Sequence, residues 1–325
     1  MNYLKLIPQY GLFVFLFPTK AFTFLKHTDT TIEINVRHEK TFYSTHLQRQ
    51  VTLEVVLPAN YINTNFAYKV LYMNDGQDLD RLNMTEAIEK TTPFIEPFIL
   101  IAIHCGERIQ EYGIASRPDY KQRGAKAGSY TQFVLEELMP YIQEHYRVLT
   151  GPKNTVFCGF SLSGLSAFDI VWHHPELFGK AGVFSGSFWW RQKAYENHYD
   201  DHTDRIMHQL VRNTPVGAGL ASAPEELTKE IRAELTKEIR ADVKPAPTDR
   251  PQFWLQTGSE DEKDDRNGNG VIDSIEDTLD LIAELERKGY RWGKDIRYVE
   301  VKDGHHDQET WSAIMPDFLK WAFGK

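Results

Sequence analysis

Residues 154–172 read NTVFCGFSLSGLSAFDIVW, and this stretch predicts a buried strand that turns sharply into a helix. The apolar run at 155–158 is typical of a short strand, and apolar side chains recur at helical spacing from Leu162 onward. Ser161 lies at the corner, in GFSLSG, which nearly matches the G-x-S-x-G elbow that raises a serine Oγ above the end of a parallel sheet. The N–H of Leu162, at the helix start, is placed to stabilise an oxyanion. The turn therefore predicts a nucleophile and an oxyanion donor together, although Gly and Ser also form ordinary strand-to-helix loops.

Composition limits the class of protein. The chain has 325 residues, of which 41% are hydrophobic, and this is enough for one large α/β core. Its formal net charge is -9 and its basic residues are scattered, so we expect no nucleic-acid partner. Cys105 and Cys158 lie beside apolar strand runs, which indicates buried thiols and argues against a disulfide framework or a zinc site.

Residues 1–30 form a predicted leader. Lys5 precedes an apolar run at 12–17, and TKA at 19–21 offers a small-residue cleavage site, whereas Pro8 departs from the signal-peptide pattern. The sequence therefore leaves export and a cytoplasmic location open. The apolar run is far shorter than the ~20 residues that a membrane-spanning helix needs, so we predict no membrane span.

Strand and helix patterns alternate along the rest of the chain. Alternating β-branched residues at 31–36 and 51–57 predict an antiparallel pair. Further strands are expected at 68–73, 98–104, 155–158, 181–187, 251–257 and 296–301. Helices are expected at 130–146, after Ser161 and at the C-terminal end of the chain. This order predicts an α/β fold with a mostly parallel central sheet and helices on both faces.

The organisation expected is one domain, residues 31–325, with a helical cap insertion at about 191–250. Inside the insertion the octapeptide ELTKEIRA occurs twice in succession, at 226–233 and 234–241. Opposite charges three and four residues apart stabilise a surface helix, so the repeat predicts duplicated helical turns and suggests no chemistry.

Polar side chains follow four of the expected strands. Ser161, an acidic cluster with Asp261, and His306 each come after a strand, and the carboxyl ends of parallel strands gather active-site residues. The order serine, acid, histidine is that of a Ser-His-Asp triad on an α/β sheet. The fourth strand ends in NDGQD, where the N–H of Gln77 can point at an oxyanion. Each signal is weak alone, and together they predict nucleophilic catalysis.

Neighbouring residues compete for two of these roles. Glu260 and Glu262 flank Asp261, so the acid could be displaced by one residue. His305 competes with His306, although the pattern Gly-x-His-Asp with a tryptophan five residues later favours His306.

Four segments together resemble the esterase family of α/β-hydrolases, which includes feruloyl and acetylxylan esterases, esterase D, enterochelin esterases and the mycolyltransferases. The segments are YKVLYMNDGQD, ELMPYIQEHYRV, GFSLSGLSAF with PELFGKAGVFSGSFWW, and GHHDQETW, and the resemblance runs from about residue 51 to the C-terminus. It implies an α/β-hydrolase fold with Ser161 as nucleophile, Asp261 as acid and His306 as base. It also implies that the N–H groups of Gln77 and Leu162 form the oxyanion hole. Ser163 departs from the family, which usually has the first of two glycines there.

A calcium-type loop follows the predicted acid. Residues 265–276 read DRNGNGVIDSIE, with oxygen ligands at positions one, three, five, nine and twelve and glycine at position six. This matches the EF-hand loop at its diagnostic positions. The predicted ligands of one structural Ca²⁺ are Asp265, Asn267, Asn269, the Val271 carbonyl, Asp273 and Glu276. An ordinary Asn/Gly turn is the alternative.

The resulting hypothesis is a serine carboxylic-ester hydrolase that acts through an acyl-enzyme on a small-molecule ester, without an organic cofactor. The segments YKVLYMNDGQD and ERIQEY favour an enterochelin-type siderophore esterase. A carbohydrate feruloyl or acetyl esterase, an acyltransferase, and a non-catalytic binding protein on a hydrolase scaffold remain as alternatives. The sequence does not define the oligomeric state.

Overall fold

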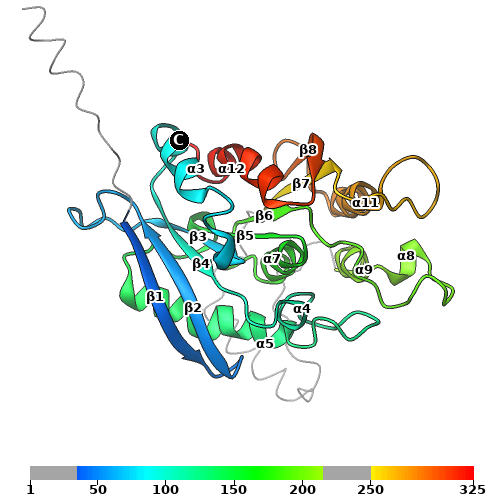
Figure 1. Cartoon of the computed structure of the whole chain (residues 1–325), viewed down its shortest axis with the longest axis horizontal. Helices are drawn as coiled ribbons and strands as arrows, with labels where there is room; N and C mark the ends of the chain where they lie inside the picture. Colours follow the sequence, from blue (N-terminus) through cyan, green and yellow to red (C-terminus); the bar gives the residue numbers. More distant parts are fainter. Residues whose placement is uncertain (1–34, 215–249) are drawn as a thin grey trace, which may run out of the picture. The chain divides into compact units, whose positions relative to one another are not determined.

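An eight-stranded sheet forms the centre of the computed structural model, which describes residues 35–214 and 250–325 (Figure 1). The strand order is β1-β2-β4-β3-β5-β6-β7-β8. β1 pairs with β2 and β2 with β4 in antiparallel fashion, and all pairings from β4 through β8 are parallel. The strands are β1 Asn35–Ser44, β2 Arg49–Leu57, β3 Lys69–Asn74, β4 Phe98–Ile103, β5 Thr155–Phe160, β6 Lys180–Phe184, β7 Gln252–Glu260 and β8 Ile296–His305.

Helices pack on both faces of this sheet. The helices that bear on the site are α3 Met84–Thr91, α4 Arg108–Glu111, α5 Ala127–Gln132, α6 Met139–His145, α7 Leu162–His173, α8 Asp201–Asp204, α9 Ile206–Asn213, α11 Asp273–Arg287 and α12 Gln308–Phe323. A 3₁₀ turn, η1, spans Gly76–Asp78. The predicted α/β fold with a mostly parallel, doubly covered sheet is confirmed.

Two hydrophobic cores arise because side chains alternate across each strand. On β3, Val70 and Tyr72 enter the core shared with α7, α9 and α11. Leu71 and Met73 on the same strand enter the core shared with α3 and α12. Both faces are apolar, as expected of a parallel sheet covered on each side, and this holds the strand ends rigidly.

Several element bounds differ from the sequence expectations. β1 begins at Asn35 and continues to Ser44, so most of the strand expected at 31–36 lies outside the described residues. β7 and β8 run three and four residues past the predicted ends, to Glu260 and His305. The helix expected at 130–146 begins at Ala127 and has a π-helical stretch, Phe133–Leu138, between α5 and α6.

Some predictions fall on residues that the structure does not describe. These are the leader at 1–30 and the duplicated octapeptide at 226–241. The described part of the expected cap insertion contains α8 and α9. No helix within residues 35–214 and 250–325 is long and apolar enough to span a membrane.

Candidate active site

Ser161 occupies the strained corner between β5 and α7. Its backbone has φ 56° and ψ -119°, a conformation that residues other than glycine rarely adopt. The Ser161 N–H donates to the Phe184 carbonyl (2.8 Å), and the N–H of Gly164 donates to the Ser161 carbonyl (3.1 Å). A Cβ at Gly159 would lie 2.3 Å from the Ser163 carbonyl oxygen, so the turn requires glycine there. The predicted strand-turn-helix elbow is present.

The strand pairing brings the ends of β5 to β8 to one edge of the sheet. Phe160 pairs with Phe184, Phe184 with Gln256, and Glu260 with His305. Asp261 and His306 therefore leave adjacent strands side by side, and Ser161 leaves β5 at the same edge. Ser161, Asp261 and His306, which follow three separate strands in the sequence, thus lie at one edge of the sheet.

Asp261 and His306 influence each other electrostatically. Asp261 is 9% exposed, and neither of its carboxylate oxygens has a hydrogen-bond partner of good geometry among the described residues. Burial raises the pKa of Asp261, while the Gly258 N–H, the Ser185 hydroxyl and the His306 imidazole oppose that rise. A buried carboxylate whose oxygens lack well-formed hydrogen bonds calls for an explanation, and the neighbouring His306 imidazole is a candidate partner.

The His306 ring packs against α12 at the open edge of the site. Its centroid lies 5.4 Å from that of Trp311, at an interplanar angle of 75°. Trp311 Nε1 in turn donates to Ser185 Oγ (3.0 Å), so the tryptophan supports the imidazole and reaches the loop after β6. Desolvation lowers the pKa of His306; the Asp261 charge raises it and the Arg108 charge lowers it further.

The competing acids Glu260 and Glu262 have surroundings that differ from those of Asp261. Glu260 is exposed. Burial raises the pKa of Glu262 to about 7, and the charges that act on it are those of Asp264, Asp273 and Asp277. Glu262 therefore belongs to the acidic surroundings of α11, which leaves Asp261 as the carboxylate beside the histidine.

The predicted oxyanion donors lie on two different loops. Leu162 is the first residue of α7, so its N–H has no carbonyl partner within the helix. Gln77 is the middle residue of η1, where an N–H likewise lies ahead of the first completed turn. Gly76 brings η1 close to the sheet, because a Cβ there would lie 2.6 Å from the Ala102 carbonyl carbon.

Sequence reasoning missed several polar groups around the nucleophile. Ser187 Oγ lies 3.4 Å from Ser161 Oγ, and the Ser187 N–H donates to the Ser161 carbonyl (3.1 Å). Arg108, for which the sequence predicts no role in the site, forms an ion pair with the buried Asp75. No local motif indicates these contacts, because each joins segments that are distant in sequence.

Neither thiol is a competing nucleophile. Burial raises the pKa of Cys105 to about 11, with a further contribution from the Asp75 charge, and burial also raises the pKa of Cys158. Both thiols therefore stay protonated at neutral pH. Cys158 is buried as predicted, whereas Cys105 is only half-buried, and neither forms a disulfide bond.

The predicted calcium loop is closed by hydrogen bonds among its own side chains. Asn267 Nδ2 donates to both carboxylate oxygens of Glu276 (2.7 and 2.9 Å), and Asn269 Nδ2 donates to one of them (2.7 Å). Asp265 accepts the N–H groups of Asn269 and Gly270 (3.1 and 2.8 Å). Gly270, at position six, has φ 88° and supplies the sharp turn of an EF-hand loop. Positions one, three, five and twelve thus converge.

Position nine of the loop is engaged by a cation. Asp273 accepts the backbone N–H of Arg266 (2.9 Å), and its other oxygen lies 3.3 Å from the Arg266 guanidinium. The guanidinium also lies 3.6 Å from Glu276. Within the described ranges, no group of three or more His, Cys, Asp or Glu side chains is arranged to hold a metal ion. The oxygen set fits Ca²⁺ in part, with Arg266 competing for two carboxylates.

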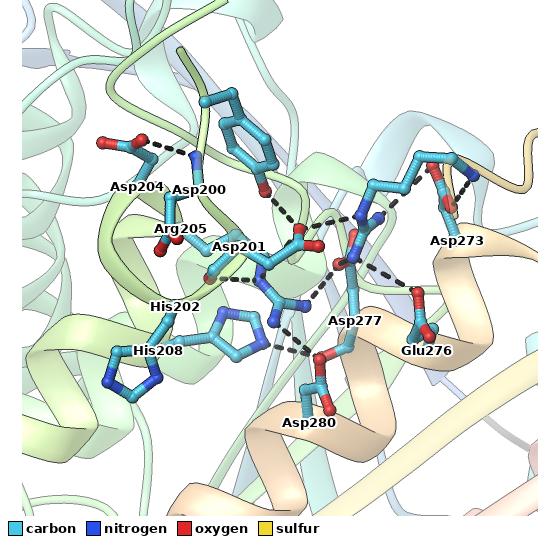
Figure 2. A network of polar contacts seen from close by, with 12 residues as sticks. Asp200, Asp201, His202, Asp204, Arg205, His208, Asp273, Glu276, Asp277 and Asp280 are labelled. Atoms are coloured by element: carbon cyan, nitrogen blue, oxygen red, sulfur yellow. Dashed lines mark hydrogen bonds and ion pairs between the residues drawn. The ribbon is translucent and has the colours of Figure 1, made fainter. Parts of the chain in front are cut away.

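A charge network centred on the buried Asp277 joins this loop to the segment after β6 (Figure 2). Arg266 pairs with Asp201 and Asp277 (2.8 and 2.6 Å), and Arg205 pairs with Asp277 and Asp280 (2.7 and 2.6 Å). The two guanidinium groups share the Asp277 carboxylate, which is 1% exposed. The network therefore fixes α8 and α9 against α11, close to the loop that bears the acid.

The mostly parallel, covered sheet and the strand-turn-helix corner at Ser161 are those of an α/β-hydrolase fold. A model of the family described as "Putative esterase" matches residues 44–322, and the chain belongs to that family.

Comparison with individual proteins gives distant similarity. The protein YbbA of Bacillus subtilis (strain 168) is 28% identical over 148 residues, which is 44% of this chain and 59% of that protein. The chain thus spans less than two thirds of this relative. A solved ferulic acid esterase superposes with a TM-score of 0.60 at 17% identity, covering 90% of this chain and 98% of that one. The enterobactin esterase FES of Shigella flexneri superposes with a TM-score of 0.60 at 15% identity, covering 90% and 60%. At these identities the solved structures show the shared fold.

The proximity of Asp261 and His306 can be tested by titration. We expect the pKa of His306 to lie below the ordinary 6.5, because partial burial disfavours the imidazolium. Asp261→Asn removes the negative charge that favours the imidazolium, so the pKa should fall further, whereas Glu262→Gln should leave it unchanged. The histidine Cε1–H resonances followed against pH, with His306 assigned through His306→Asn, measure this. An unaltered titration in Asp261→Asn would contradict the pairing.

Proposed function

We propose that this protein is a serine carboxylic-ester hydrolase that works through an acyl-enzyme, with Ser161 as nucleophile, His306 as base and Asp261 as acid. The observation that carries the proposal is the strained Ser161 corner at the same sheet edge as a buried Asp261 beside His306. Strain at an exposed catalytic turn is retained where it positions a nucleophile. Membership of the esterase family supports the same chemistry.

In the acylation step, Ser161 Oγ bonds to the ester carbonyl carbon and its proton passes to the His306 imidazole. The carbonyl oxygen becomes an oxyanion that accepts hydrogen bonds from the backbone N–H groups of Leu162 and Gln77. The tetrahedral intermediate collapses, the bond to the alcohol oxygen breaks, and the alcohol takes the proton from His306. Asp261 holds the imidazole in the required tautomer and stabilises its positive charge.

Deacylation repeats these steps with water in place of the serine. The water oxygen attacks the acyl carbon while His306 accepts a proton from the water. The tetrahedral intermediate then collapses, Ser161 Oγ takes the proton back from His306, and the carboxylic acid leaves. The helix dipole of α7, whose first residue is Leu162, adds positive potential where the oxyanion forms. Transfer to another alcohol would use the same residues, and product analysis with an added alcohol acceptor distinguishes transfer from hydrolysis.

For the substrate, we propose a siderophore-type ester, which agrees with the solved enterobactin esterase among the structural neighbours. A feruloyl ester is the second candidate. The observation that supports this second candidate is the extent of the superposition, which covers 98% of the ferulic acid esterase and 60% of the enterobactin esterase. Hydrolysis of p-nitrophenyl esters, ferric-catecholate esters and feruloyl esters, compared by kcat/KM, decides between them.

Removal of the nucleophile should abolish turnover while the fold remains intact. We expect Ser161→Ala to lower kcat for a p-nitrophenyl ester by roughly 10⁴- to 10⁶-fold. A fluorophosphonate should label Ser161 in the wild type and no serine in the variant, as read by peptide mass spectrometry. Ser312→Ala, on α12, is the matched control and should keep full labelling. Turnover in Ser161→Ala within tenfold of wild type would refute the nucleophile assignment.

The acid assignment makes a separate prediction. Asp261→Asn should lower kcat by about 10⁴-fold, because the imidazole would be held in the wrong tautomer. Glu260→Gln and Glu262→Gln should cost far less, because Glu260 is exposed and Glu262 lies among other carboxylates near α11. Steady-state kinetics of the three variants measure the difference. If Glu260→Gln is the crippling change, the acid lies one residue earlier.

We further propose that residues 265–276 bind one structural Ca²⁺. Convergence of Asp265, Asn267, Asn269 and Glu276, with the turn at Gly270, supports this proposal. Affinity on the order of 10⁻⁵ M or weaker is expected for a loop with three carboxylates and a neighbouring guanidinium. The ion would add no chemistry to the ester reaction; it would hold the segment between β7 and α11.

Calcium should therefore raise the melting temperature. At about 100 times its dissociation constant, Ca²⁺ would stabilise the fold by about 2.7 kcal/mol through mass action. Asn267→Asp adds a carboxylate at position three and should tighten binding, whereas Glu276→Gln should weaken it. Mg²⁺ should substitute poorly, because it requires a smaller octahedral shell. Identical melting curves in excess chelator and in millimolar calcium would identify the loop as an ordinary Asn/Gly turn.

A further inference from the structure

The Asp75 carboxylate joins three segments around the nucleophile. Asp75 is 2% exposed and follows β3 directly. One of its oxygens accepts from Ser163 Oγ (2.6 Å) and the other from Gln77 Nε2 (3.0 Å). The Arg108 guanidinium donates to both oxygens (3.0 Å each). Four donors thus surround this buried carboxylate, and such charge-assisted hydrogen bonds are about twice as strong as neutral ones.

The two uncharged donors belong to the two walls of the oxyanion hole. Ser163 directly follows Leu162, whose N–H is one expected oxyanion donor, and Gln77 supplies the other. Ser163 Oγ also accepts the Phe160 N–H (2.7 Å), and the Ser163 carbonyl accepts Asn74 Nδ2 (3.0 Å). The elbow and the segment after β3 are therefore joined by the Asp75 carboxylate and by the Asn74 amide.

The backbone of Asp75 is held as firmly as its carboxylate. Its left-handed conformation, φ 56° and ψ 46°, directs the chain into η1. The Asp75 N–H donates to the Tyr112 hydroxyl (3.2 Å), and its carbonyl accepts the Asp78 N–H (2.9 Å). A displacement of Asp75 would move η1, and with it the Gln77 N–H, relative to Ser161.

Arg108 makes the buried charge tolerable and links it to the mouth of the site. Its Nη2 donates to the Phe160 carbonyl (2.9 Å), at the last residue before Ser161. The guanidinium side chain is 38% exposed, whereas Asp75 is 3% exposed in its side chain. A buried carboxylate without this cation would cost several kcal/mol.

We propose that Asp75 is a positioning residue that sets the spacing between the Leu162 and Gln77 N–H groups through its hydrogen bonds to Ser163 and Gln77. This proposal rests on the proposed ester hydrolysis. The hydrogen bonds fix the donors before substrate arrives, so no reorganisation is required when the oxyanion forms. Removing the Ser163 hydroxyl should loosen the donor pair without touching nucleophile, base or acid.

The test compares transition-state with ground-state affinity in Ser163→Ala. We expect kcat for a p-nitrophenyl ester to fall roughly 10- to 100-fold with KM within about threefold, because misplaced oxyanion donors weaken the transition state. Affinity for an acyl trifluoromethyl ketone, which forms a tetrahedral adduct on Ser161, should fall by the same factor as kcat. Affinity for the corresponding non-electrophilic amide should not change.

Ser166→Ala is the matched control. Ser166 is buried on the same helix, and its hydroxyl bonds the N–H and carbonyl of Gly113 (2.7 and 3.0 Å) instead of Asp75. It should lower the melting temperature by a similar amount and leave kcat and ketone affinity unchanged. Gln77→Ala, at an exposed position, removes the second contact to Asp75 together with the hydrogen bond that Gln77 Oε1 accepts from the Cys105 N–H (3.2 Å). Gln77→Ala should lower kcat and ketone affinity by the same factor, which should be smaller than the factor for Ser163→Ala. If Ser163→Ala does not fold, Gln77→Ala provides the test.

The outcomes separate this proposal from the proposed function. Ester turnover and fluorophosphonate labelling of the wild type would support the proposed ester hydrolysis. If Ser163→Ala and Gln77→Ala then match Ser166→Ala in kcat and ketone affinity, the positioning role of Asp75 is refuted while the proposed hydrolysis is not. A fall in kcat without a fall in ketone affinity also refutes it. A wild type without turnover and without labelling refutes both proposals.

Discussion

The backbone conformation of Ser161 is the constraint on which the site depends. A non-glycine residue at φ 56° and ψ -119° costs of order 1–3 kcal/mol, and it persists because the surroundings determine it. β6 and the loop after it contribute, since the Ser161 N–H donates to the Phe184 carbonyl and the Ser161 carbonyl accepts the Ser187 N–H. Gly159 removes the side chain that would prevent the close approach of α7. The sheet therefore bears the cost of holding the serine in place.

Burial of both sheet faces extends this rigidity to the remaining site residues. Adjacent residues of β3 and β4 enter opposite cores, so neither strand can slip by one residue without reversing its whole apolar pattern. Between β7 and β8 the register shifts after Gly258, and the resumed pairing of Glu260 with His305 places Asp261 beside His306. The positions of the residues at the strand ends thus depend on side-chain packing in the two hydrophobic cores.

Local patterns made the elbow, the parallel sheet and the serine-acid-histidine order predictable, because each depends on spacing within one segment. The contact of Arg108 with Asp75 could not be predicted, since 33 residues separate them and a basic loop resembles solvated surface. The sequence left Glu260 and Glu262 open beside Asp261, and only the fold shows that Glu262 lies among other carboxylates near α11. The extra residues of β7 and β8 are held by the pairing of the two strands, which the strand propensity of each segment alone does not predict.

The charge network beyond β7 follows a different logic from that of the site. Arg205 and Arg266 share the buried Asp277, and burying such groups is costly unless every partner is present (Figure 2). An arrangement of this kind adds little net stability, but it tolerates few alternative geometries, because displacing α8 or α11 would leave a charge unpaired. The acid-bearing segment ends at α11. Its position is therefore determined at one end by strand pairing and at the other by this network, with the predicted calcium loop between them.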